Sequence, residues 1–347
     1  MPEPVNVSEY AEAAAAKVDP AIWCYFEGGS GDEVTLRANL AAYDRWRFRP
    51  RTLVDVTDVT TETTLLGTPV AMPLGVAPFA MQGLIDPEGE VATTRAAAAA
   101  GALMCVSTLT TRTHGDIAAA SSGPRWLQLY VLADRRRTLD HIQEARDAGY
   151  SAVVLTVDLP YVGRRERDLR LGFQNPPPDL ELPYASLFET LPALTWRDLE
   201  WIRSETEMPL VLKGILTRED ATLAVEHGAE AVWVSNHGGR QLDGVAAGLD
   251  ALPEVVDAVA SRCEVYVDGG IYRGTDVLKA LALGARAAFA ARAFACGLAV
   301  NGERGVAHVL SLLHDELRLG LGLLGCTSPE SVTRSHVEPT LPYYLPA

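Results

Sequence analysis

The chain has 347 residues, 48% of them hydrophobic and 22% charged, so it carries enough apolar surface for a folded core and is not disordered throughout. Its 30 Lys and Arg against 45 Asp and Glu give a formal net charge of −15, which disfavours nucleic acid and anionic membranes as partners. The five cysteines are scattered, with no CxxC pair, so we expect neither a disulfide framework nor a metal site.

The first 70 residues precede the first strand pattern. We expect residues 1–70 to form an N-terminal helical cover over the base and one side of the main fold. The sequence from Met1 has neither the basic nor the apolar segment of a secretory signal, and no run reaches the roughly 18 apolar residues that span a bilayer. These features predict a cytoplasmic location and no membrane partner.

Short apolar runs then alternate with segments of helical spacing. Near-continuously apolar strands are typical of a parallel sheet that is buried on both faces. Eight such strands, each followed by a helix, predict a (β/α)8 TIM barrel over about residues 71–330, within a single domain of residues 1–347. An open doubly wound sheet is the alternative, and the missing GxGxxG after the first strand disfavours it. The predicted strands are 73–78, 102–107, 126–130, 152–158, 209–213, 231–235, 264–268 and 287–291.

One long insertion interrupts the fourth strand–helix pair. Residues 172–197 begin with a proline cluster and lack a strand or helix pattern. Long loops in compact domains are usually functional, so we predict an active-site loop after strand 4.

Polar side chains stand where the apolar strands end. In a parallel barrel the carboxyl ends of the strands meet at one mouth, where barrel enzymes do their chemistry. Buried polar groups without partners cost about 1–3 kcal/mol each, so a large polar ligand is expected across the mouth. The strand ends supply Ser107, Gln128, Tyr130, Thr156, Asp158, Lys213, Ser235, Asp268 and Arg292.

The densest group of reactive residue types is Ser-Asn-His-Gly-Gly-Arg-Gln-Leu-Asp at 235–243. His237 is suited to act as a base near neutral pH, and Arg240 offers a planar fork for a carboxylate. A buried Asp158 facing the histidine would hold its tautomer. A lone histidine at a strand end is more often structural, but the company of Arg240 and Asp158 favours the catalytic interpretation.

The ordered set of motifs resembles the FMN-dependent L-2-hydroxy acid oxidases and dehydrogenases, the family of glycolate oxidase, lactate oxidase, mandelate dehydrogenase and 4-hydroxymandelate oxidase. The resemblance runs from about Val5 to His336. It is carried by Tyr25-Phe-Glu-Gly-Gly, Phe48-Arg-Pro-Arg51, Ala77-Pro78 with Ala80, Pro87-Glu-Gly-Glu90, Gln128-Leu-Tyr130, Thr156-Val-Asp158, Gly163-Arg-Arg165, Leu212-Lys-Gly214, the 235–243 segment and Asp268-Gly-Gly270.

The resemblance implies the roles of the reacting residues. His237 is implied to remove a proton from the substrate, either from the α-carbon or from the hydroxyl, with Asp158 as its partner. Tyr130 is implied to lie near the substrate hydroxyl. The residues implied to bind the substrate carboxylate are Arg165, Arg240 and Tyr25.

FMN is the implied cofactor. Lys213 is implied to lie near flavin N1, where a fixed positive charge stabilises the reduced ring. Two positions near the phosphate depart from the family, because Tyr272 replaces an arginine and Ala291 a glycine, so we expect weaker FMN retention. The residues implied to contact FMN are Pro78, Phe79, Ala80, Ser107, Gln128, Thr156, Lys213, Ser235, Asp268, Gly269, Gly270, Arg273, Ala291 and Arg292.

Three departures bear on the substrate. Leu109 stands where glycolate-type oxidases carry a tryptophan, Phe79 replaces a threonine, and the 172–197 loop is shorter than in glycolate oxidase. We therefore expect a bulky or aromatic 2-hydroxy acid such as mandelate or 4-hydroxymandelate, bound beside Leu109 and Phe79. The alternative is that both residues repack around a small acid, lactate or glycolate.

The electron acceptor is predicted to be O2, with H2O2 as product, because the chain has no haem domain and Ala80 keeps the small residue usual in the oxidases. A dehydrogenase with another acceptor is the alternative. The family resemblance also implies a homo-oligomer, commonly a tetramer.

Two other functions remain open from the sequence. A barrel aldolase or isomerase could use Lys213 as a Schiff base. A flavin-binding relative without activity is disfavoured, because the implied catalytic set is intact.

Overall fold

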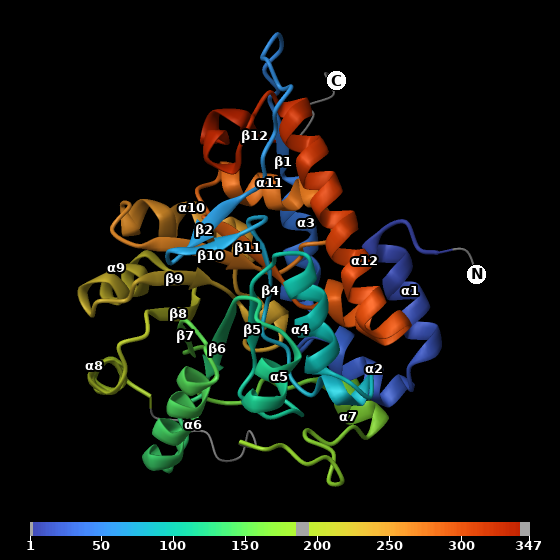
Figure 1. Cartoon of the computed structure of the whole chain (residues 1–347), viewed down its shortest axis with the longest axis vertical. Coiled ribbons are helices and arrows are strands. Elements are labelled where there is room, and N and C mark those ends of the chain that lie inside the picture. Colours follow the sequence, from blue (N-terminus) through green and yellow to red (C-terminus); the bar gives the residue numbers. More distant parts are fainter. Residues whose placement is uncertain (1–2, 185–193, 341–347) are drawn as a thin grey trace.

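The computed structural model describes residues 3–184 and 194–340. Within them, eight parallel strands form a closed barrel (Figure 1), which confirms the predicted (β/α)8 fold. The barrel strands follow the eight predicted apolar runs one for one, and their ends differ from the prediction by at most two residues. They are β4 Leu74–Val76, β5 Met104–Val106, β6 Arg125–Leu129, β7 Val153–Thr156, β8 Leu210–Ile215, β9 Ala231–Val234, β10 Glu264–Asp268 and β11 Ala287–Ala290.

Helices surround the barrel and follow each of its strands. α7 (Glu166–Leu171) is an extra helix between β7 and α8, and α12 is kinked at Asn301 and Gly302. The helices that follow the strands in order are α4 Glu90–Ala99, α5 His114–Ala120, α6 Arg135–Asp147, α8 Trp196–Glu205, α9 Arg218–Glu226, α10 Gly248–Val259, α11 Gly274–Ala282 and α12 Arg292–Leu324. Short 3-10 turns are η1 Gln82–Leu84, η3 His237–Gly239, η4 Pro329–Ser331 and η5 Arg334–His336.

The barrel interior explains why polar side chains gather at its mouth. Successive side chains of a strand point to opposite faces, so residues two apart share a face. The middle of the barrel is filled by the fully buried aromatic residues Trp126, Trp233, Tyr266 and Phe289. Two residues farther along the same strands stand Gln128, Ser235, Asp268 and Ala291. On these four strands, the side chain that follows the buried aromatic residue on the inward face lies at the mouth of the barrel.

The segment before the barrel covers both of its ends. The β2–β3 hairpin lies at the base, where Leu65 and Val70 pack against the aromatic plug. α2 and α3 instead lie at the mouth, where Tyr25 and Asn39 line the cavity, so the predicted position over the base is correct only for the hairpin. The elements outside the barrel are α1 Val7–Lys17, α2 Pro20–Glu27, α3 Val34–Asp44, β1 Trp46–Phe48, β2 Thr63–Leu65, β3 Thr68–Val70 and β12 Val337–Pro339.

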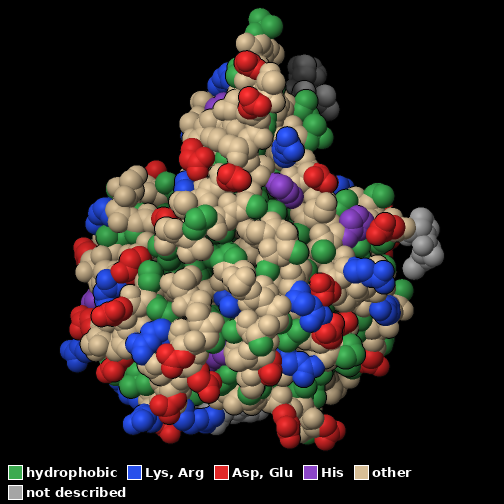
Figure 2. Space-filling view, in the orientation of Figure 1, with side chains coloured by type: hydrophobic (Ala, Val, Ile, Leu, Met, Phe, Trp, Pro, Cys, Tyr) green, Lys and Arg blue, Asp and Glu red, His purple; other side chains and the backbone are tan. Residues whose placement is uncertain are grey.

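β1 and β12 pair antiparallel in a projection at the top of Figure 1, and α1 lies alongside α12. On the face shown in Figure 2, acidic and basic side chains are interspersed around the lower part of the molecule. None of the described helices is both long enough and apolar enough to cross a membrane.

The predicted active-site loop follows α7. Its residues 185–193 lie outside the described part of the chain. The ring of Phe173 stacks on Tyr25 with centroids 5.1 Å apart, and Leu182 packs against a cluster that contains Leu109 and Tyr130. The described part of the loop thus contacts side chains at the barrel mouth.

Candidate active site

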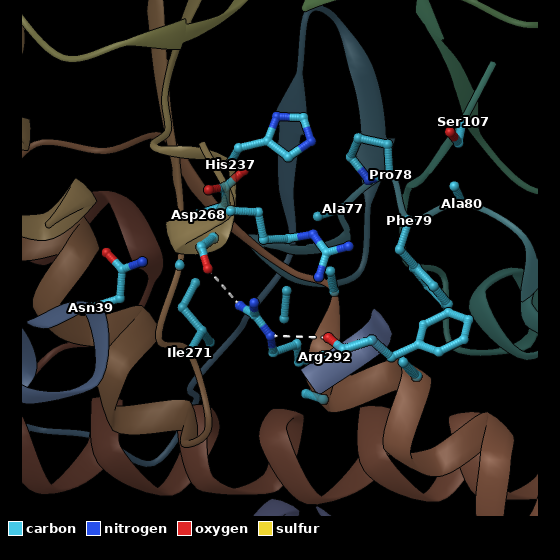
Figure 3. A pocket seen from close by; sticks show the side chains of 18 of the residues that line it. Asn39, Ala77, Pro78, Phe79, Ala80, Ser107, His237, Asp268, Ile271 and Arg292 are labelled. Carbon is cyan, nitrogen blue, oxygen red and sulfur yellow. Dashed lines mark hydrogen bonds between the residues drawn. The ribbon is translucent and has the colours of Figure 1, made fainter. Parts of the chain in front are cut away.

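A cavity of about 1200 Å³, including its open mouth, lies at the carboxyl ends of the barrel strands. Figure 3 shows His237, Asp268 and Arg292 on one side of it and Phe79, Ala80 and Ser107 on the other. The structure brings most predicted site residues to its wall: Tyr25, Pro78, Phe79, Ala80, Ser107, Leu109, Gln128, Tyr130, Thr156, Arg165, Lys213, His237, Arg240, Asp268, Gly269, Gly270, Ala291 and Arg292.

His237 and Asp158 form a hydrogen-bonded pair. The Nδ1 atom of His237 lies 2.9 Å from Oδ1 of Asp158, and since a carboxylate can only accept, Nδ1 carries the hydrogen. This assignment leaves Nε2 as the acceptor. Burial lowers the pKa of His237, and the charges of Lys213 and Arg165 act in the same direction against the opposing effect of Asp158. The imidazole is therefore neutral near pH 7 and can take a proton.

Asp158 stays ionised although it is buried. Burial works to raise its pKa, but the imidazole of His237 and the charge of Lys213 outweigh it, and the pKa is lowered. Gly214 has a φ of +114°, and a Cβ there would lie 2.7 Å from Cβ of Asp158, so only glycine allows this close approach. His237 itself has a φ of +57°, a left-handed conformation rare for residues other than glycine.

Lys213 is fixed as a buried cation. Its Nζ donates to Oγ of Ser235 at 2.9 Å and lies 3.3 Å from a carboxylate oxygen of Asp268. Ser235 in turn donates to Asp268 at 2.8 Å. Burial works to lower the pKa of Lys213, but Asp268 and Asp158 outweigh it, and the pKa is raised. The ammonium therefore remains charged at the cavity wall. Ser235 and Asp158, which were also predicted as site residues, do not line the cavity themselves but contact residues that do.

Two arginines flank Tyr25, of which Arg165 is buried and Arg240 half-buried. Arg240 donates through one nitrogen to the carbonyl oxygens of Tyr25 and Gly28, the latter at 3.0 Å. Arg165 is 7% exposed, and among the described residues its Nε and one terminal nitrogen have no hydrogen-bond partner. Burial, reinforced by the charge of Arg165, lowers the pKa of Arg240 to about 9. Two neighbouring cations with unused donors have the chemistry to bind a carboxylate.

A chain of polar side chains runs across the ends of the neighbouring strands β5, β6 and β7. Gln128 donates to the hydroxyl of Thr156 at 3.0 Å and accepts from the hydroxyl of Ser107 at 3.2 Å. All three are buried at the ends of neighbouring strands. They offer both donors and acceptors to a flat heteroaromatic edge.

Arg292 lines the end of the cavity after β10 and β11, where the sequence places it. The side chain of Arg292 donates to four carbonyls, those of Phe26, Glu27, Gly28 and Gly238, and two of these bonds are drawn in Figure 3. Its guanidinium is therefore held by carbonyl oxygens at the carboxyl end of α2 and by that of Gly238.

Arg273 is not brought to the cavity. It pairs with Glu316 of α12 at 2.8 Å and is about half exposed, because the residue after Tyr272 points away at the start of α11. Tyr272 itself lines the cavity, and burial raises its pKa to about 12, so the phenol is neutral.

The remaining lining residues make an apolar wall. Leu109, Tyr130, Leu132 and Leu159 form one buried cluster, against which Ala80 and Leu182 pack. Leu159 was not predicted from the sequence, although it directly follows Asp158 at a strand end and that position was a usable signal. An apolar side chain of a ligand would contact Leu109 and Leu159.

Asn39 of α3 is another site residue that the sequence did not reveal. It is buried, and its side-chain amide exchanges two hydrogen bonds with the amide of Asn236, at 2.9 and 2.8 Å. This pair ties α3 to the turn that carries His237. No local pattern could indicate a contact across 197 residues of sequence.

The residues present fit FMN. The cavity is lined both by the polar chain of Ser107, Gln128 and Thr156 and by the fixed cation of Lys213, which lies beside Thr156 on the next strand. Gly270 has a φ of +77°, and a Cβ there would lie 2.1 Å from the carbonyl oxygen of Asn39, so the backbone after β10 closes tightly on α3. The N-terminus of α12 starts in the same wall and offers N–H groups to a phosphate.

Comparison with known proteins gives consistent matches along the whole chain. The sequence profile of a family described as FMN-dependent dehydrogenase matches residues 14–339. An L-lactate oxidase of Nostoc sp. is 46% identical, covering 96% of this chain and 97% of that protein. A glycolate oxidase of Spinacia oleracea is 42% identical over 96% of each chain. A crystal structure of mandelate oxidase superimposes with a TM-score of 0.92 and 44% identity, covering 98% of this chain and 99% of that one.

Proposed function

The chain belongs to the family of FMN-dependent 2-hydroxy acid oxidases, enzymes that act on CH–OH donors, and from this premise we propose that it oxidises an (S)-2-hydroxy acid with a bulky or aromatic side chain, such as mandelate or 4-hydroxymandelate, to the 2-oxo acid. O2 is the proposed electron acceptor and H2O2 the second product. The observation that carries the proposal is the buried guanidinium of Arg165, two of whose nitrogens have no partner within residues 3–184 and 194–340, in the cavity that His237 lines.

The proposed chemistry begins with substrate binding. The carboxylate of the acid accepts hydrogen bonds from the free nitrogens of Arg165 and from Arg240. Two charge-assisted hydrogen bonds to a buried anion fix its orientation, and they place the α-carbon within the cavity lined by His237 and Tyr130. Burial raises the pKa of Tyr130 well above its usual value, so its phenol stays protonated and can donate to the substrate hydroxyl oxygen.

His237 then removes one proton from the substrate through Nε2. The imidazolium that forms is stabilised by the carboxylate of Asp158 at 2.9 Å. FMN is the cofactor, and when bound it accepts the two electrons and the second hydrogen that the substrate loses. Lys213 holds a positive charge at the same wall, where negative charge accumulates during reduction.

The apolar wall supports the choice of a bulky substrate. Burying apolar surface gains about 25 cal/mol per Å², so roughly 100 Å² of a phenyl ring against Leu109 and Leu159 would favour binding by about 2.5 kcal/mol. This corresponds to roughly 50- to 100-fold in kcat/KM over an acid without the ring. If Leu109 and Phe79 instead repack around a small acid, the preference reverses.

The Schiff-base alternative has less support. An aldolase lysine must be a neutral amine, whereas Lys213 is held charged by Asp268 and Ser235. Borohydride in the presence of substrate should therefore leave Lys213 unmodified.

A substrate panel tests the proposal. We expect kcat/KM to be highest for (S)-mandelate or 4-hydroxymandelate among acids that include lactate and glycolate. A higher value for lactate or glycolate would exclude the bulky substrate class. Stopped-flow reoxidation of the reduced enzyme tests the acceptor, because slow reaction with O2 would indicate a different one. We also propose a homo-oligomer, on the family resemblance, which light scattering would measure.

A further inference from the structure

Glu90 is a buried acidic residue that the chemistry described above does not use. It is the first residue of α4, its exposed fraction is 0%, and among the described residues it forms no ion pair. Burial raises its pKa, and hydrogen bonds from Thr111 and Gln82 act in the opposite direction. Burying a carboxyl group without a cation costs free energy of folding, so hydrogen bonds from its neighbours must compensate.

Those neighbours belong to the loops that follow β4 and β5. Oε1 of Glu90 accepts from the backbone N–H of Gln82 at 3.2 Å and from that of Thr111 at 3.1 Å. Oε2 accepts from the hydroxyl of Thr111 at 2.6 Å, and this hydroxyl accepts from the N–H of Gly83 at 3.2 Å. A single carboxyl group therefore joins two loops that are separated by about 25 residues of sequence.

The joined loops carry the apolar side of the cavity. The β4 loop, residues 77–83, supplies Phe79 and Ala80, and the β5 loop, residues 107–112, supplies Leu109. Met81 N–H also donates to the carbonyl of Leu109 at 3.0 Å. The position of Phe79 relative to Leu109 thus depends on this direct bond together with the hydrogen bonds that end at Glu90.

The loops have little room to adjust. A Cβ on Gly83 would lie 2.7 Å from the hydroxyl oxygen of Thr111, and one on Gly89 would lie 2.9 Å from the backbone nitrogen of Gly83. Close backbone packing of this kind transmits a lost hydrogen bond into a shift of the loop.

We propose that Glu90 is a positioning residue that fixes the separation of the β4 and β5 loops and so determines which substrate side chains fit between Phe79, Ala80 and Leu109. The inference rests on the proposed function, in which this wall receives the side chain of the 2-hydroxy acid. Glu90 itself touches neither the cavity nor the reacting atoms.

Glu90→Leu tests the proposal because it keeps the size of the side chain and removes both acceptors. We expect kcat/KM for mandelate to fall at least about tenfold more than kcat/KM for lactate, since only the larger acid contacts both loops. Glu90→Gln can keep the two backbone bonds through its carbonyl oxygen, and it should restore the wild-type ratio to within about threefold.

Glu264→Leu is the matched control. Glu264 is a carboxyl at the barrel base that likewise joins a loop to the barrel, accepting from Leu66 N–H at 3.2 Å and from the hydroxyl of Tyr266 at 2.5 Å. We expect it to lower Tm comparably and to leave the substrate ratio unchanged. If Glu90→Leu does not fold, Thr111→Val removes the 2.6 Å bond and should shift the ratio in the same direction.

A second readout needs no turnover. Non-reactive benzoylformate and pyruvate, titrated against the FMN-loaded protein by flavin absorbance, should show weaker binding of benzoylformate alone in Glu90→Leu. An unchanged ratio in both kinetics and binding, for Glu90→Leu or Thr111→Val, would overturn the positioning role. A wild-type preference for lactate would refute the proposed substrate class, whereas a shifted ratio in the variants would still support the role of Glu90.

Discussion

Replacing Arg165 with methionine should separate activity from stability. The guanidinium is buried, and two of its nitrogens have no partner among the described residues. It also lies near Arg240, whose pKa burial and the charge of Arg165 both lower. The free enzyme therefore keeps a buried cation with unused donors, to which we expect the substrate carboxylate to bind. Arg165→Met removes that cation and roughly preserves the apolar stem.

The size of the effect follows from the unused donors. A hydrogen bond to a charged group contributes about 1.5–3 kcal/mol, so two lost bonds correspond to about 3 kcal/mol or more, which is at least roughly 150-fold in kcat/KM. In the other direction, replacing a buried charge with an apolar side chain is often neutral or stabilising by about 1–4 kcal/mol. The lost contact with the ring of Tyr25, 5.7 Å from the Arg165 guanidinium carbon, offsets about 0.5–1 kcal/mol of that gain.

The assay combines steady-state kinetics with thermal unfolding. We expect Arg165→Met to lose kcat/KM for the 2-hydroxy acid, to discriminate less between the acid and its uncharged amide, and to keep or raise Tm. Arg167→Met is the control, because that guanidinium is 40% exposed and already bonded to Glu27 and Glu33, at 2.8 and 2.6 Å. It should lower Tm slightly and leave kcat/KM nearly unchanged. A large fall in Tm for Arg165→Met, or a kcat/KM within tenfold of wild type, would refute the reasoning.

Two further predictions concern the active site, and a third concerns His114, a buried histidine at the start of α5. Asp158→Asn should lower kcat about 10³- to 10⁴-fold in single-turnover reduction, because the amide no longer holds His237 in the reactive tautomer; retention of the wild-type rate would exclude this role. Leu109→Trp should fill the apolar wall and shift the kcat/KM ratio from mandelate toward lactate by at least about tenfold, whereas an unchanged ratio would place the side chain elsewhere. Burial lowers the pKa of His114 from 6.5 to about 4, so the unfolded chain binds the proton more readily and stability is lost as pH falls through that window. Urea unfolding should show a loss of about 3 kcal/mol at most between pH 7 and pH 4 that His114→Phe reduces; equal pH dependence in both proteins would contradict it.

The sequence was sufficient for the barrel because barrel strands are local, apolar and regularly spaced. Each of the eight runs became a strand, and the period of two then placed Ser107, Gln128 and Lys213 at the mouth. The His237–Asp158 pair was also predictable, since both residues follow strand ends.

What the sequence could not supply were contacts between distant segments. Asn39 reaches the site because α3 packs on the turn at Asn236, and Glu90 matters because two loops meet at its carboxyl. Neither contact leaves a periodic signal. Arg273 and Arg292 were expected at the phosphate end from motif position. Arg292 does line the cavity there, with its side chain bonded to backbone carbonyls, whereas Arg273 pairs with Glu316 away from the cavity.

Rapid mixing without O2 shows whether this site oxidises a 2-hydroxy acid with His237 as base. FMN-loaded protein mixed with (S)-mandelate should lose its flavin absorbance near 450 nm and release about one benzoylformate per flavin. His237→Gln should bind FMN yet bleach at least about 10²-fold more slowly. If no 2-hydroxy acid bleaches the wild-type flavin, the protein does not oxidise this class of substrate; if the His237→Gln variant bleaches at the wild-type rate, His237 is not the base.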